Sequence, residues 1–169
     1  KPELKYLDHW VFDTESQAAG NDDDGRVDAG ETIDLAIALK NRWGKAEDVT
    51  VTLDAWAPSA VAPDPYVTIS NSTVNYGAIG SFNEDDNGLT YDADGVITGV
   101  NVPFTFATLS DTPNDHVIPF RMTITARNGI GYPDGIVYEF EERFTLTVQR
   151  GRELPMVISE DMTLTSDDF

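Results

Sequence analysis

The chain has 169 residues, no cysteine, and 30 acidic side chains against 11 basic ones, which gives a formal net charge of −19. A chain of this length predicts one compact domain with its own core, and the lack of cysteine excludes disulfides. The acidic balance argues against nucleic acid as a partner, because the phosphate backbone would be repelled. No apolar run reaches the roughly 18 residues of a membrane-spanning helix, so we expect no membrane insertion.

Apolar residues recur at every second position along most of the chain, which is the periodicity of strands with one buried face. The expected strands cover, in chain order, residues 4–12, 33–39, 49–53, 67–69, 74–76, 100–106, 118–124 and 136–148. The turn at Asn41–Gly44, between the second and third of these, predicts that they pair as a hairpin. Many short antiparallel strands are typical of a two-sheet sandwich, so we expect an all-β sandwich of seven to eight strands.

Two segments depart from this alternation. Residues 81–99 are polar and rich in Gly and Asp, which indicates an insertion. Residues 150–169 also leave the strand pattern. We therefore interpret residues 1–149 as the sandwich domain and residues 150–169 as a tail or the start of a following module.

The segment GNDDDGRVDAGE, residues 20–31, holds five carboxylates within ten positions. Gly25 fits the sixth position of a twelve-residue calcium loop, where a tight turn is needed. The oxygen donors of such a loop then fall on the side chains of Asp22, Asp24, Asp28 and Glu31 and on the carbonyl of Arg26. Calcium prefers six to eight oxygen ligands, so this spacing predicts a calcium site.

The acidic segment also departs from a standard calcium loop. Gly20 at the first position has no side chain, so the missing donor would be Asn21, Asp13 or water. A strand pattern follows Glu31 where an EF-hand would have a helix. Magnesium fits less well because it retains its waters, and a solvated acidic turn without metal is the alternative.

A second candidate metal site lies in the predicted insertion. Asp92, Asp94 and the carbonyl of Val96 repeat half of the motif, and the acidic run Glu84–Asp86 lies nearby in sequence. The same DADG sequence also forms good turns by itself, because Asp side chains bond to nearby backbone and Gly accepts positive φ. Both interpretations remain open at this point.

Several motifs together resemble a known family. They are the acidic loop, GETIDLAIALKN, AEDVTVTL, HVIPFRMTITA and RFTLTV. The chain over about residues 3–149 resembles the immunoglobulin-like surface modules of bacteria and archaea that are related to the cell-adhesion-related domain found in bacteria. The resemblance implies an immunoglobulin-like antiparallel β-sandwich that serves as a non-catalytic spacer or adhesive unit of an exported protein.

Catalytic chemistry has little support in the sequence. The chain has no cysteine and two histidines, His9 and His116, without the spacing of a catalytic zinc site, so we expect no enzyme activity. Trp43, in a predicted turn, and Trp56, at the end of a strand, are candidates for stacking on sugar rings. Burial in the core is the alternative for both.

These observations predict a calcium-stabilised structural or adhesive module of a larger extracellular or cell-surface protein. Its expected partners are neighbouring domains of the same polypeptide, and polysaccharide or other surface proteins. Two alternatives are a carbohydrate-binding module of a secreted enzyme and a self-assembling subunit of an extracellular fibre. The fibre subunit would use an unpaired edge strand or the terminal segment 153–165.

Overall fold

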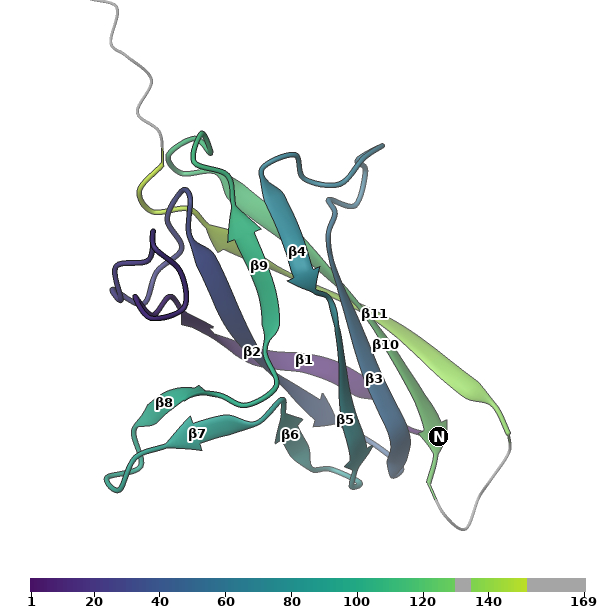
Figure 1. Ribbon diagram of the computed structural model, residues 1–169. Coiled ribbons are helices and arrows are strands. Elements are labelled where there is room, and N and C mark those ends of the chain that lie inside the picture. Colours follow the sequence, from purple (N-terminus) through teal and green to yellow (C-terminus); the bar gives the residue numbers. More distant parts are fainter. Residues whose placement is uncertain (130–134, 152–169) are drawn as a thin grey trace, which may run out of the picture.

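The computed structural model describes residues 1–129 and 135–151, and its regular elements there are all strands (Figure 1). In chain order these are β1 (Leu4–Phe12), β2 (Thr32–Asn41), β3 (Ala46–Ala55), β4 (Val67–Asn71), β5 (Thr73–Ile79), β6 (Glu84–Asp86), β7 (Leu89–Tyr91), β8 (Ile97–Val100), β9 (Phe104–Thr108), β10 (Val117–Asn128) and β11 (Val137–Thr147). No helix in these two ranges is long and apolar enough to cross a membrane.

The strands form two antiparallel sheets and a separate hairpin. One sheet has the order β1-β2-β9-β4, with β6 also paired to β2, and the other has the order β11-β10-β3-β5. The two sheets share one core, so the predicted all-β sandwich is confirmed. The two sheets hold nine strands of the described chain, one of them β6, and β7 and β8 form the hairpin; β6 and β7 lie within the region predicted as an insertion, and β8 begins there.

Alternating residues of both sheets build the core, as the sequence pattern predicts. The even spacing of Ile33, Leu35, Ile37 and Leu39 places all four side chains in the buried interior. Phe106 of β9 packs edge-on against Phe120 of β10 with ring centroids 5.1 Å apart. These contacts join the two sheets directly, so burial of apolar area is the main stabilising term of the fold.

The predicted hairpin of residues 33–39 with 49–53 is wrong, because β2 and β3 lie in different sheets. The buried amide of Asn41 explains the crossing: its Nδ2 donates to the carbonyls of Gly44 (2.8 Å) and Ile79 (3.1 Å), and its Oδ1 accepts from the Glu3 N–H (3.2 Å). Ile79 ends β5 of the second sheet. Asn41 therefore holds residues 41–45 as a corner between the sheets.

The region predicted as an insertion completes an edge of β2. Along this edge β9 pairs with Thr32–Leu35 and β6 pairs with Ala38–Lys40. Asn87 fills the gap between these two pairings, because its Oδ1 accepts from the Ile37 N–H (2.7 Å) and its Nδ2 donates to the Leu35 carbonyl (3.1 Å). Residues 84–87 are thus part of the sheet and not an appended loop.

The acidic segment connects β1 to β2 at one end of the sandwich, and the chain leaves β11 at the same end (Figure 1). Of the segment interpreted as a tail, Arg150 and Gly151 are described and lie against the acidic loop and the loop at Asn114. Residues 152–169, including the segment 153–165 of the fibre hypothesis, lie outside the described residues.

Candidate metal centre

Asp13 organises the turn that carries the acidic loop. It directly follows β1, is only 2% exposed, and its carboxylate accepts from the N–H groups of Asp24 and Gly25, both at 2.9 Å. Asp23 and Gly25 have φ values of 58° and 76°, so the chain turns tightly around this carboxylate. The glycine at this position supplies the turn that the calcium-loop alignment requires.

Asn21 anchors the loop to the first residue of β2. Its Oδ1 accepts from the Thr32 N–H (2.9 Å), and its Nδ2 donates to the carbonyls of Thr32 (2.7 Å) and Thr14 (3.2 Å). The Asn21 amide, one of the alternative donors considered for the metal, is therefore used to position the loop. Asp13 is the better placed of the two side-chain alternatives.

The second half of the loop is buried against the end of β9. The Thr108 hydroxyl donates to the Asp28 carbonyl (2.6 Å) and accepts from the Gly30 N–H (2.9 Å). The Asp28 N–H donates to Oε2 of Glu31 (2.8 Å), and Glu31 is only 2% exposed. Two carboxylates are thereby fixed in the interior at the point where β2 begins.

The carboxylates of the loop converge as the spacing predicts. One oxygen each from Asp22, Asp28 and Glu31 lie within 4.8 Å of one another, and the same holds for Asp13, Asp22 and Asp24. Asp22 belongs to both groups. All four predicted carboxylate ligands therefore lie in one cluster, with Asp13 as a fifth member.

Arg26 lies at the exposed side of this cluster. Its N–H donates to Oδ1 of Asp24 (3.0 Å), which is an Asx turn, and its Nε is 4.0 Å from Oδ2 of the same side chain. None of the described contacts brings the Arg26 carbonyl, predicted as a ligand, to the carboxylate cluster. The contribution of Arg26 to the described site is its backbone N–H.

Glu31 is a buried carboxyl whose pKa is raised by its surroundings. Burial raises the pKa of its carboxyl, and the nearby charges of Asp13, Asp28 and Asp22 raise that pKa further, against the lowering effect of the hydrogen bond from the Asp28 N–H. A positive charge among these oxygens would favour the ionised form. The cluster is therefore an all-oxygen donor set of the kind that hard divalent cations prefer.

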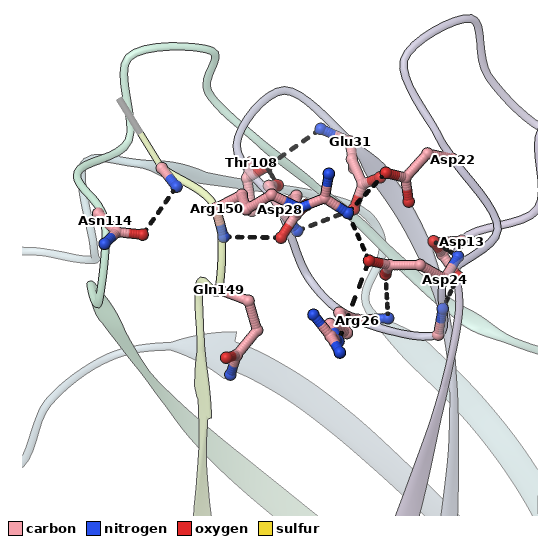
Figure 2. Close-up of polar contacts among 12 residues, drawn as sticks. Asp13, Asp22, Asp24, Arg26, Asp28, Glu31, Thr108, Asn114, Gln149 and Arg150 are labelled. Atoms are coloured by element: carbon pink, nitrogen blue, oxygen red, sulfur yellow. Dashed lines mark hydrogen bonds and ion pairs between the residues drawn. The ribbon is translucent and has the colours of Figure 1, made fainter. Parts of the chain in front are cut away.

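Sequence reasoning did not find Arg150, which lies among these carboxylates (Figure 2). Its Nη2 is 2.9 Å from Oδ2 of Asp22 and 2.6 Å from Oδ2 of Asp24, and its Nε is 2.9 Å from Oδ2 of Asp28. Asp28 and Arg150 are 122 residues apart in the chain. No local pattern signals this contact, because it depends on where β11 ends relative to the loop.

The second candidate metal site is a hairpin turn in the structure. Oδ1 of Asp92 accepts from the N–H groups of Asp94 and Val96, both at 2.9 Å, and Gly95 has a φ of 81°. The Val96 carbonyl accepts from the Asp92 N–H (2.9 Å). These oxygens are used by the turn between β7 and β8, as the alternative interpretation of this sequence proposes.

The acidic run before this hairpin also serves its own backbone. Oδ1 of Asp86 accepts from the N–H groups of Gly88 and Leu89, and Oδ1 of Asp85 accepts from the Asp86 N–H. Glu84 pairs with Lys40 at 3.1 Å. No group of three converging acidic or histidine side chains is found in residues 84–96.

The two tryptophans considered for sugar binding differ in their surroundings. Trp43 is 62% exposed at the corner between β2 and β3 and makes a T-shaped contact with Phe82, with ring centroids 5.9 Å apart. Trp56 follows β3, and the guanidinium of Arg121 lies over its ring at 5.4 Å. Since they lie at opposite ends of β3, they do not form one platform.

Both histidines have aromatic and polar partners within the fold. His9 lies against Tyr6 and Phe144, and its Nδ1 is 2.6 Å from the Tyr6 hydroxyl. Burial lowers the pKa of His9. His116 pairs with Asp64 through Nε2 at 2.8 Å. Neither histidine is in the acidic clusters, so these contain carboxylates alone.

Compared with known proteins, the chain matches no family model and none of the curated sequences. We therefore infer function from the geometry of the site. Asp13, which follows β1, and four carboxylates of the acidic loop meet at one end of the sandwich, where Thr108 at the end of β9 and Arg150 after β11 contact the same loop. Such an arrangement can hold a cation between the end of β1 and the start of β2, which are neighbours in one sheet.

Proposed function

We propose that this chain is a non-catalytic structural or adhesive module of a larger extracellular or cell-surface protein, and that calcium binds its acidic loop and stiffens it. The observation that carries the proposal is the convergence of Asp22, Asp28 and Glu31 within 4.8 Å, with two of the three buried. Burying carboxylates next to one another is costly unless a positive charge compensates them.

Asp22, Asp28 and Glu31 would hold the ion, with Asp24 and Asp13 close enough to contribute further oxygens. The ion would supply two positive charges to a segment rich in carboxylates. Asp13 lies at the end of β1 and Glu31 at the start of β2, so a bound ion would tie the two strand ends together. Calcium fits this donor set better than magnesium, which holds its waters and rarely accepts an all-protein cage.

The strand order supports the immunoglobulin-like assignment. An immunoglobulin constant-type domain pairs strands 1-2-5-4 in one sheet and 3-6-7 in the other. The orders β1-β2-β9-β4 and β3-β10-β11 follow this pattern when β5 to β8 are set aside. β5 is then an extra strand beside β3. Domains of this architecture commonly serve as modules of surface proteins, which is consistent with the proposed role.

Calorimetric titration and thermal unfolding test the calcium proposal. The protein is first treated with a chelator and then titrated with calcium and, separately, with magnesium. At a calcium concentration a hundred times the Kd, binding to the folded state alone adds about 2.7 kcal/mol of stability. The unfolding midpoint should then rise by roughly 5–10 °C, and a chelator should reverse the rise. An identical midpoint in calcium and in chelator would contradict the proposal.

Saccharide binding is a second candidate function because of the surroundings of Trp43. This exposed ring borders a groove of about 600 Å³ that is lined by Lys1, Pro2, Glu3, Lys5, Trp43 and Phe140. An exposed aromatic face next to a groove is a usual place for a sugar ring to stack. Retention on insoluble polysaccharide tests it: Trp43→Ala should abolish retention, whereas Trp56→Ala, whose ring already contacts Arg121, should leave it intact.

A further inference from the structure

Arg150 joins the acidic loop to the end of β11 through its side chain and its backbone. The guanidinium reaches Asp22, Asp24 and Asp28 at 2.6–2.9 Å. The Arg150 N–H donates to Oδ1 of Asp28 (2.8 Å), and its carbonyl accepts from the Ala29 N–H (2.9 Å). The backbone contacts do not depend on the charged side chain.

The guanidinium contacts the same carboxylates that would hold a metal ion. Both groups of converging carboxylates contain Asp22, and its Oδ2 is 2.9 Å from the Arg150 Nη2. Asp28 has its Oδ2 within 2.9 Å of the Arg150 Nε and its Oδ1 on the Arg150 N–H. A divalent cation placed among these oxygens would repel the guanidinium and compete with it for the lone pairs.

The side chain of Arg150 is free to leave the cluster. It is 61% exposed, so moving it into solvent does not uncover a packed surface. The main chain on both sides stays attached: the Gln149 N–H donates to the Val27 carbonyl (2.9 Å), and the Gly151 N–H donates to Oδ1 of Asn114 (3.2 Å). Release of the guanidinium therefore does not require the chain to detach.

We propose that Arg150 is a built-in cation that occupies the acidic cluster when no metal is bound and is displaced by the metal. This proposal rests on the proposed calcium function and describes its regulation. Arg150 neutralises part of the cluster, which keeps the metal-free loop folded and lowers the affinity for calcium. Metal binding thus replaces the guanidinium as the positive charge among these carboxylates, and the backbone hydrogen bonds of residues 149 and 150 keep the loop attached to the end of β11.

Calcium titration of Arg150→Gln by calorimetry tests the competition. The affinity should rise roughly three- to tenfold, which is the range expected when two or three exposed ion pairs no longer compete. Arg26→Gln is the matched control, because it also removes one positive charge next to the acidic cluster, while its Nε is 4.0 Å from Oδ2 of Asp24. An equal affinity change in the two variants would show only a general charge effect and would overturn the proposal.

Thermal unfolding of the same variants separates this idea from the calcium proposal itself. In chelator, Arg150→Gln should unfold at a lower temperature than the wild type, and in saturating calcium the two should coincide. If the wild type and Arg150→Gln bind calcium with the same affinity, the proposed competition is contradicted and the calcium proposal is not affected. If neither protein binds calcium, both proposals fall.

The Nε–H resonance of Arg150 gives a direct reading in the unmodified chain. A guanidinium held by three carboxylates exchanges its Nε proton slowly, so this signal should be visible in the metal-free protein and disappear or move to the position of free arginine when calcium is added. The signal of Arg26 should change little. A Nε signal that persists unchanged in saturating calcium would exclude displacement.

Discussion

Two acidic, glycine-containing segments of this chain have similar sequences and different structures. In residues 20–31, carboxylates from successive positions of one loop meet in a partly buried cluster that also contacts β9 and the end of β11. In the turn at Asp92–Gly95, the Asp92 carboxylate bonds to the backbone of its own hairpin and stays exposed. Charge density alone therefore does not make a candidate metal site; convergence and burial do.

Local turn geometry is shared by the two segments. Asp13 and Asp92 each accept two backbone N–H groups, and Gly25 and Gly95 each have a positive φ. The segments differ in what surrounds these turns. Matched pairs of substitutions can therefore separate the contribution of the turn from that of its environment.

The largest difference is expected for the substitution of Glu31 by glutamine. Glu31→Gln removes a buried ligand, so the roughly 2.7 kcal/mol that calcium adds at a hundred times its Kd should be lost. Asp94→Asn in the other segment should retain the full calcium effect. Differential scanning calorimetry in calcium and in chelator measures both. A full calcium-induced rise in the midpoint of Glu31→Gln would remove Glu31 from the site.

Truncation of the two turn-forming aspartates should give the next largest difference. Asp13→Ala leaves the N–H groups of Asp24 and Gly25 without their buried acceptor, which should cost about 2–3 kcal/mol of unfolding free energy. Asp92→Ala leaves the N–H groups of Asp94 and Val96 to bond with water, so it should cost about 0.5–1 kcal/mol of unfolding free energy. Urea unfolding in chelator measures both values, and equal losses would show that burial does not distinguish the two turns.

Alanine at the two positive-φ glycines should have similar and smaller effects. An ideal Cβ at Gly25 or Gly95 meets no atom within 4 Å, so only backbone strain remains, at about 1 kcal/mol for each. Urea unfolding of Gly25→Ala and Gly95→Ala should give values within the error of each other in chelator. A much larger loss for Gly25→Ala would mean that the acidic loop imposes more strain than its φ indicates.

The smallest effect is the pH dependence that Glu31 contributes in chelator. Its folded-state pKa is raised by burial and by neighbouring carboxylates, so the folded state binds a proton more tightly than the unfolded state does. As pH rises from the ordinary pKa of Glu, near 4.5, through the raised folded value, the wild type should lose stability relative to Glu31→Gln. In saturating calcium the sign should reverse, because protons compete with the metal. Urea unfolding between pH 4 and pH 7.5 tests both signs.

Much of the fold follows from strand periodicity, because a strand with one buried face must alternate. The alternating runs of β2, β3 and β10 are buried as predicted. The pairing of β2 with β3 was not predictable from their short connection, because the corner depends on the Asn41 amide and on Ile79, 38 residues away. Likewise, Asn87 completes β2 from a segment whose composition indicates only a polar insertion.

The sequence predicts the carboxylates of the candidate site but not the arginine that lies among them. Asp22, Asp24, Asp28 and Glu31 follow from loop spacing, since the ligands of a single loop are close in sequence. Asp13 was an alternative because it ends the preceding strand. Thr108 ends β9 and Arg150 follows β11, and their positions depend on how these two strands are placed against the loop.

The hydrogen bonds that join residues 149–151 to residues 27–29 have a mechanical consequence. Tension applied to the chain beyond Gly151 reaches the acidic loop through these bonds and the Arg150 ion pairs before it loads the β10-β11 ladder. In an assembly of modules joined end to end, a pulling force on this end of the domain would be borne by the acidic loop together with the loop at Asn114 before it reaches the strands.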